Sequence, residues 1–148
     1  MSDVVKITYQ LDPGAYKPTK AHPSDAGYDL YARMDVDLAA GGTVRVDTGV
    51  QVLIPDGYVG LVQPRSSYSS AGVGTVTGVI DAGYTGSISV VLSSKSDLKI
   101  YAGSRIAQLV IVPLPEIRLV EGDVMSHKSD VMSHKSERGC GGFGSTGR

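Results

Sequence analysis

The sequence predicts an all-β domain of the jelly-roll type. Apolar and polar residues alternate with a period of two over several short segments, which is the spacing of half-buried strands. Glycine supplies 19 of the 148 residues, as tight turns between short strands require. We find no convincing amphipathic helix. Many short strands at close spacing favour a β-sandwich or barrel, here a jelly-roll.

The first clear strand pattern covers residues 43–55, TVRVDTGVQVLIP. Val44 and Val46 share one face of this segment, and Arg45 and Asp47 share the other. The pattern predicts a half-buried strand. Short sequences rich in Gly, Pro and Asp predict the turns of the domain, namely AAGGT (39–43), PDGY (55–58), DAGY (81–84) and AGS (102–104).

Three further segments complete the expected domain. Residues 66–72 form one short helical turn at most. Residues 78–86, GVIDAGYTG, predict a β-hairpin with Asp81 at its tip. Residues 86–92 predict a strand whose apolar face carries Ile88, Val90 and Leu92. Residues 98–114 include the mostly apolar run 106–112, which predicts a strand buried on both faces.

Composition excludes several function classes. Lys and Arg number 14 and Asp and Glu 15, so the formal net charge is −1. This balance argues against broad binding to nucleic acid or to an anionic membrane. No apolar run approaches the roughly 18 residues of a membrane span, and the first residues do not resemble a signal peptide. The one cysteine, Cys140, suits a reducing compartment, so we expect an intracellular, cytoplasmic protein.

The C-terminal part differs in composition from the rest. VMSHKSD (124–130) is followed directly by VMSHKSE (131–137), and two heptads are too few to predict a coiled coil. The histidines of these copies, His127 and His134, are more often solvated than metal ligands. We expect a β domain over 1–122, a linker over 123–137, and a flexible glycine-rich arm over 138–148, RGCGGFGSTGR.

Five short stretches carry polar and charged residues that could form a site, some of them suited to binding phosphate. Each alone favours a structural interpretation: Asp81 in an ordinary turn, Arg65 in a polar turn, Asp29 in a salt bridge. Gln108 interrupts an apolar strand, so its amide either binds neighbouring backbone or faces a polar site. Backbone N–H groups of a glycine-rich segment can bind phosphate, although a lone glycine-rich segment is weak evidence.

Together and in order, these stretches resemble the five motifs of the trimeric dUTPase (deoxyuridine triphosphatase) family. The matching segments are AGYDL (26–30), PRSS (64–67), GVIDAGY (78–84), GSRIAQLVI (103–111) and RGCGGFGSTG (138–147). The resemblance implies a jelly-roll homotrimer with active sites at subunit interfaces. It also implies Mg²⁺-dependent hydrolysis of dUTP to dUMP and pyrophosphate, which limits uracil incorporation into DNA and supplies dUMP for dTMP synthesis.

The resemblance also implies a role for each matching residue. Asp81 would activate the water that attacks the α-phosphorus, and Tyr84 would pack under the deoxyribose and exclude a 2′-hydroxyl. Asp29 would organise the phosphate-binding arginines, and Mg²⁺ would be held through substrate phosphates and waters rather than by protein ligands. The other implied substrate-binding residues are Arg65, Ser66, Ser67, Thr75, Val79, Ile80, Ser89, Gln108, Arg138, Phe143, Gly144, Ser145 and Thr146.

Two alternatives to a dUTPase remain open at this stage. A dCTP deaminase has a similar fold but would need a glutamate in the strand after the hairpin, and SISVVL (87–92) has none. The other alternative is a protein that uses the fold to bind a regulatory partner. The heptad copy 131–137 would then be a candidate appendage for that binding. Because all five motifs are present, hydrolysis ranks above pure regulation.

Overall fold

The computed structural model describes residues 4–75 and 78–125. The chain divides into two units, Met1–Glu116 and Ile117–Arg148. The expected boundary after residue 122 therefore stays a prediction. In the second unit the described residues, 117–125, form no helix or strand. Within the described ranges, no helix is long and apolar enough to cross a membrane.

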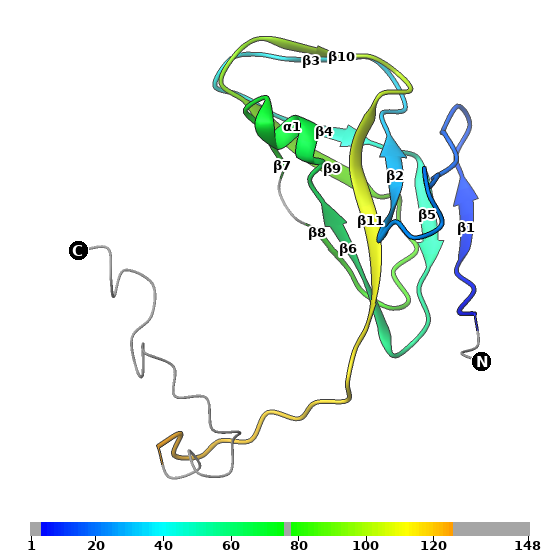
Figure 1. The fold of residues 1–148 in the computed structure, drawn as a ribbon, viewed down its shortest axis with the longest axis vertical. Coiled ribbons are helices and arrows are strands. Elements are labelled where there is room, and N and C mark those ends of the chain that lie inside the picture. Colours follow the sequence, from blue (N-terminus) through cyan, green and yellow to red (C-terminus); the bar gives the residue numbers. More distant parts are fainter. Residues whose placement is uncertain (1–3, 76–77, 126–148) are drawn as a thin grey trace. The chain divides into compact units, whose positions relative to one another are not determined.

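The first unit is almost entirely β-structure, which confirms the all-β jelly-roll prediction (Figure 1). Its one described helix, α1 (Ser66–Ser70), is the single short turn that the sequence predicts. The described strands are β1 (Thr8–Leu11), β2 (Gly27–Tyr31), β3 (Val36–Leu38), β4 (Thr43–Asp47), β5 (Val50–Leu53), β6 (Tyr58–Gln63), β7 (Val73–Thr75), β8 (Gly78–Ile80), β9 (Ser89–Ser94), β10 (Leu98–Ile100) and β11 (Arg105–Pro113).

The strands pair into four antiparallel sheets. The largest has the order β2-β11-β6-β8, and a second has the order β4-β9-β7. Strands β1 and β5 form one pair, and β3 and β10 form another. Figure 1 shows the long strand β11 between β2 and β6. Most neighbours are far apart in sequence, so long-range pairing defines this fold.

The core lies between the faces of the two larger sheets. Leu30 of β2 and Ile106 of β11 are fully buried on one side, and Val90 and Leu92 of β9 on the other. All four belong to one apolar cluster. Fully burying such a side chain contributes about 1.5–3 kcal/mol. The predicted inward face of Ile88, Val90 and Leu92 is confirmed, with exposures of 1%, 1% and 0%.

The predicted strand over residues 43–55 is wrong as a single strand. The chain forms β4 and β5 with a break at Thr48 and Gly49, and these strands belong to different sheets. Gly49 has φ +67°, which side-chain-bearing residues rarely adopt. Thr48 uses both its N–H and its hydroxyl to bind the carbonyl of Ile88, at 3.0 and 2.7 Å. The alternation of apolar residues continues through the break, so the pattern alone does not reveal it.

Two other details differ from the sequence prediction. Ile106, Ala107 and Leu109 are buried, but the rest of 106–112 is partly exposed, and of these residues Ile111 borders an open apolar pocket. The predicted hairpin around Asp81 is also wrong. Strand β8 pairs with β6, whereas β9 pairs with β4 and β7. Asp81 therefore lies in a loop that connects two sheets.

Candidate active site

A pocket of about 270 Å³ lies beside the loop that follows β8. Its wall includes residues of β4, β8 and β9 together with the loop between the last two. Five of the site residues predicted from the sequence meet here, although they come from two different sheets. The lining residues are Arg45, Val79, Ile80, Asp81, Tyr84, Ser87, Ile88, Ser89 and Val91.

The turn over residues 81–84 places Asp81 and Tyr84 at this pocket. The N–H of Tyr84 donates to the carbonyl of Asp81 at 3.1 Å, and Gly83 has φ +82°. Glycine at this position makes the left-handed conformation accessible, as a tight turn of this kind requires. The N–H of Gly83 donates to the carbonyl of Ile54 at 3.2 Å, which fixes the turn against the end of β5.

The side chains of Asp81 and Tyr84 are both exposed, so a ligand in the pocket can reach them. The carboxylate of Asp81 makes no hydrogen bond or ion pair with residues 4–75 or 78–125, so its oxygens are available to a water. Tyr84 is 45% exposed and donates its hydroxyl to the carbonyl of Ser87 at 3.5 Å. A side chain at Gly86 would collide with the Tyr84 ring, so the glycine leaves room for that ring position.

A second cluster contains predicted phosphate-site residues from β2, from β11 and from the start of α1, which follows β6. Asp29 lies between two arginines, with Oδ1 3.9 Å from Arg65 Nε and Oδ2 3.7 Å from Arg105 Nη1. Arg65 Nη1 also donates to the carbonyl of Arg105 at 3.2 Å. Arg65 and Asp29 side chains are 25% and 20% exposed, so their charges are only partly screened. One carboxylate thus orients two guanidinium groups.

Gln108 and the two serines lie at the same cluster. Gln108 Nε2 donates to the carbonyl of Pro64 at 3.4 Å, immediately before Arg65. The amide therefore binds neighbouring backbone, one of the two roles expected for it. Ser66 and Ser67 are exposed at the start of α1. In the same helix, burial raises the pKa of Tyr68, while the charge of Arg65 acts to lower it.

Thr75 lies in β7 opposite Leu92 of β9 and does not line the first pocket. Its hydroxyl is buried and has no hydrogen-bond partner among the described residues. Arg138, Phe143, Gly144, Ser145 and Thr146 lie outside the described residues. Their predicted roles stay predictions.

Sequence reasoning missed four residues of the pocket wall, Arg45, Ser87, Ile88 and Val91. Arg45 carried a usable signal, because it alternates with the buried Val46 and therefore lies on the outer face of β4. The contribution of Ser87 depends on Asp47, which lies 40 residues earlier in the sequence. No local pattern predicts that contact.

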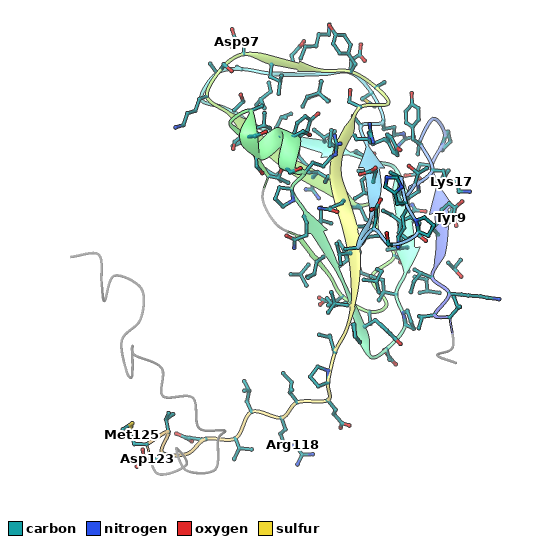
Figure 2. The ribbon with its side chains drawn as sticks, viewed as in Figure 1. Tyr9, Lys17, Asp97, Arg118, Asp123 and Met125 are labelled. Atoms are coloured by element: carbon teal, nitrogen blue, oxygen red, sulfur yellow. The ribbon has the colours of Figure 1, made fainter. Side chains whose placement is uncertain are left out.

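A larger apolar pocket of about 650 Å³ contains none of the predicted site residues. Tyr9 of β1 and Lys17 of the following loop, both labelled in Figure 2, belong to its wall together with residues of β2, β6 and β11. Neither of these two pockets includes Arg65, Ser66, Ser67 or Gln108. Within the described part of the chain, the pocket beside Asp81 and the arginine cluster therefore have no residue in common.

The fold and the two clusters define an all-β protein of jelly-roll type with one pocket beside Asp81 and one cluster of two arginines around Asp29. A protein-family model for dUTPase matches residues 15–147. The chain therefore belongs to the dUTPase family.

Relatives and solved structures agree with this family. The chain is 46% identical to the deoxyuridine 5'-triphosphate nucleotidohydrolase of Cutibacterium acnes, over 99% of this chain and 94% of the relative. It is 42% identical to that of Mycobacterium bovis, over 99% and 97%. A mutant dUTPase of Staphylococcus bacteriophage 80alpha, solved with dUpNHpp, matches with a TM-score of 0.78 and 31% identity, covering 98% of this chain and 100% of that one.

Proposed function

We propose that this protein hydrolyses dUTP to dUMP and pyrophosphate. The observation that carries the proposal is the pocket that brings Val79, Ile80, Asp81, Tyr84 and Ser89 together. The family resemblance implies a catalytic role for Asp81 and substrate contacts for the other four residues, and their grouping in one pocket supports a site for a uracil nucleotide. Family membership at 42–46% identity to nucleotidohydrolases supports the same reaction.

In the proposed mechanism, Asp81 orients a water and accepts its proton as that water attacks the α-phosphorus. The new bond joins the water oxygen to the α-phosphorus, and the bond to the bridging oxygen of the β-phosphate breaks, so pyrophosphate leaves. The exposed carboxylate of Asp81, without a protein partner in the described ranges, suits this role. A positioned general base contributes about 10²–10⁴ in rate.

Tyr84 and the neighbouring backbone would select the nucleoside. The exposed ring face of Tyr84 would pack against the deoxyribose and leave no space for a 2′-hydroxyl. Backbone groups of Val79, Ile80 and Ser89 would bind the edge of uracil, and Thr75 would contribute to substrate binding from β7. Mispairing a base with such groups leaves buried polar atoms unsatisfied, which is an effective discriminator.

The arginine cluster would bind the triphosphate. Arg65 offers a planar fork to phosphate oxygens, and Ser66, Ser67 and Gln108 add neutral donors beside it. Asp29 would keep Arg65 and Arg105 in place, as the ion pairs at 3.9 and 3.7 Å allow.

A homotrimer would unite the two clusters in one site. The pocket beside Asp81 includes no residue of the arginine cluster, so one copy would supply Asp81 and another Arg65. The arm residues Arg138, Phe143, Gly144, Ser145 and Thr146 would complete the site by binding the γ-phosphate and stacking on uracil.

Mg²⁺ would be bound mainly through substrate phosphates and waters. Among the described residues, no group of three or more His, Cys, Asp or Glu side chains could hold a metal ion. Mg²⁺ commonly keeps several waters and takes one or two carboxylates together with phosphate oxygens, so the donors here fit phosphate-bound Mg²⁺. When bound, the ion would neutralise charge on the triphosphate. A phage phi11 dUTPase, a structural neighbour, coordinates a structural Mg(II) ion.

The reaction would act on an intracellular nucleotide pool, where it limits uracil incorporation into DNA and supplies dUMP for dTMP synthesis.

Binding of a regulatory partner protein is a second candidate function. Solved neighbours include phage dUTPases described as controlling transfer of virulence genes. Deletion of residues 131–137 should then abolish partner binding while hydrolysis continues.

The test of hydrolysis is pyrophosphate release from each dNTP and from UTP by the full chain with Mg²⁺. We expect release from dUTP alone, and ammonia release from dCTP would instead identify a deaminase. Asp81→Asn should nearly abolish turnover while dUTP still binds. Asp37→Asn, the same change on the exposed face of β3, is the matched control and should leave turnover unchanged. Unchanged turnover in Asp81→Asn would remove Asp81 from the mechanism.

A further inference from the structure

The loop over residues 81–88 carries the proposed base and the proposed sugar-contacting ring, and its ends are fixed by backbone hydrogen bonds. Near its start, the N–H of Gly83 donates to Ile54, and at its end the N–H of Ile88 donates to Val50 at 2.8 Å. Between these points, Ser87 donates its side-chain hydroxyl to Asp47 Oδ1 at 2.5 Å. Ser87 thus connects the last part of the loop to a side chain of β4.

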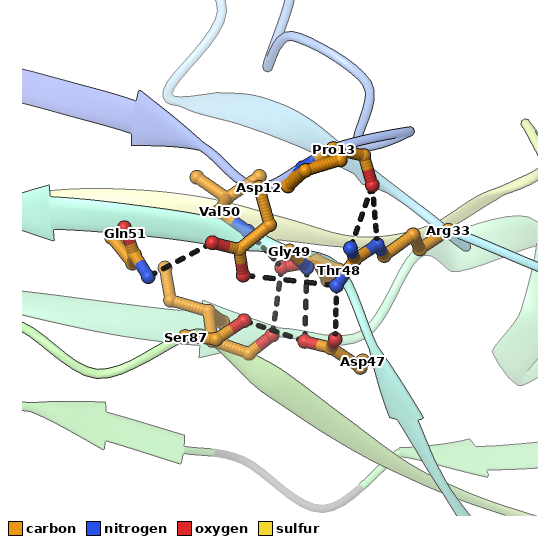
Figure 3. A network of polar contacts seen from close by, with 10 residues as sticks. Asp12, Pro13, Arg33, Asp47, Thr48, Gly49, Val50, Gln51 and Ser87 are labelled. Carbon is orange, nitrogen blue, oxygen red and sulfur yellow. Dashed lines mark hydrogen bonds and ion pairs between the residues drawn. The ribbon is translucent and has the colours of Figure 1, made fainter.

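The carboxylate that receives this hydrogen bond is held in one orientation (Figure 3). Asp47 Oδ1 also accepts from the N–H of Gly49 at 2.9 Å, and Oδ2 accepts from Arg33 Nη1 at 3.1 Å. Both oxygens are therefore occupied, and the carboxylate cannot rotate away from Ser87 without losing a charge-assisted bond.

Arg33 is fixed in turn by the loop after β1. Its Nε and Nη2 donate to the carbonyl of Pro13 at 2.9 and 2.6 Å, and its Nη1 lies 3.7 Å from Asp12. Gly49 permits this position, because a Cβ there would lie 3.1 Å from Arg33 Cδ. We call Arg33, Asp47 and Ser87 the carboxylate bridge.

The geometry points to Asp47 and Ser87 as positioning residues that set the place of Tyr84 at the sugar. Ser87 makes one hydrogen bond to β4 and another to the side chain of Tyr84. Its hydroxyl donates to Asp47, and its carbonyl accepts the hydroxyl of Tyr84. The orientation of the Tyr84 ring therefore depends on a carboxylate that does not line the pocket. This inference rests on the proposed role of Tyr84 in excluding a 2′-hydroxyl.

The first test is Ser87→Ala, measured as the ratio of kcat/KM for dUTP to kcat/KM for UTP. We expect the ratio to fall about tenfold, near the lower end of what the loss of a hydrogen bond to a charged acceptor produces. The ratio is informative because the fraction of folded enzyme cancels from it. Ser87→Thr keeps the hydroxyl and should recover most of the ratio. Gln51→Ala is the matched control, since it removes a hydrogen bond to Asp12 at the far end of the network.

Variants at Asp47 test the bridge itself. Asp47→Ala should lower the ratio as much as Ser87→Ala, and the double variant should lower it no further, because both remove the same contact. Asp47→Asn keeps an oxygen for Ser87 but places an amide toward Arg33, so its ratio should lie between wild type and Asp47→Ala.

The outcomes separate this inference from the proposed function. If wild type releases no pyrophosphate from dUTP, the proposed function is wrong, and the positioning role that rests on it is wrong with it. If wild type is active and Ser87→Ala keeps the wild-type ratio, the positioning role is wrong while hydrolysis stands. Additive losses in the double variant, or an equal loss in Gln51→Ala, would also overturn the role of the bridge, because either would indicate a general structural effect.

Discussion

Thr48→Val is the substitution that most directly tests how the loop is joined to the core. Thr48 is fully buried, donates its hydroxyl to the carbonyl of Ile88 at 2.7 Å, and accepts from the N–H of Val50 at 3.2 Å. Valine has the same shape but neither interaction. The carbonyl of Ile88 keeps the backbone N–H of Thr48 at 3.0 Å, whereas the N–H of Val50 would face a methyl group.

The magnitude follows from these two bonds. A net hydrogen bond contributes about 0.5–1.5 kcal/mol, and a buried donor left unsatisfied costs about 1–3 kcal/mol. We therefore expect the free energy of unfolding to fall by about 2–3 kcal/mol. For a domain of this size, that corresponds to a Tm lower by about 10 °C.

The assay is thermal unfolding followed by far-UV circular dichroism at one fixed protein concentration, because oligomerisation makes Tm depend on concentration. Thr43→Val makes the same chemical change at an exposed position of β4 and should shift Tm little. Equal shifts in the two variants would refute the reasoning, because the buried hydrogen bonds of Thr48 would then contribute nothing measurable.

Three other predictions concern the bridge, the strand break and the arm. Burial acts to raise the pKa of Asp47, but hydrogen bonds from Ser87, Gly49 and Arg33, together with the charge of Arg33, hold it below its ordinary value of 3.8. Because the folded pKa is lowered, ionised Asp47 stabilises the fold above about pH 3.8, and this contribution is lost as pH falls through the folded pKa. The difference in Tm between wild type and Asp47→Asn should therefore shrink below pH 3.8. A difference that stays constant as the pH falls would contradict the stabilising role of ionised Asp47. Gly49→Ala should lower Tm by several degrees, because φ is +67° and the new Cβ would lie 2.7 Å from Ala15 Cβ. Gly14→Ala is the control, because Gly14 also has a positive φ but no atom within 4 Å of the new Cβ. The Tm of this variant, measured by calorimetry, reports backbone strain alone, and the further loss in Gly49→Ala reports the collision. Truncation before Arg138 should abolish pyrophosphate release while circular dichroism still reports a folded protein, and an unfolded product would make the arm structural.

Local patterns predicted the parts of the fold and site that depend on local chemistry. The inward face of Ile88, Val90 and Leu92 follows from alternation, and the turn at Asp81 follows from its Gly and Asp content. Val79, Ile80, Asp81 and Tyr84 belong to one family motif, residues 78–84, and the resemblance adds Ser89; the pocket brings these five residues together.

The parts that sequence reasoning missed depend on contacts between distant segments. The strand break at Thr48 and Gly49 is set by hydrogen bonds to Ile88, 40 residues away. In the sequence, Asp47 has the position of an ordinary outward-facing residue of an alternating strand. Its partners Arg33 and Ser87 lie 14 and 40 residues away, so no local pattern predicts these contacts. The hairpin around Asp81 was wrong for the same reason, because β8 pairs with β6 rather than with the strand that follows the turn.

The pairing order of the strands has a consequence for synthesis on the ribosome. Strand β2 is made early, yet its described partner β11 begins only at Arg105, and β3 pairs with β10, which begins at Leu98. The largest sheet therefore cannot close until most of the first unit has left the exit tunnel. Until then, β2 presents an unpaired edge to other nascent chains, and such edges promote aggregation. Folding of this unit is therefore expected to be slow and mostly post-translational, as its non-local topology dictates.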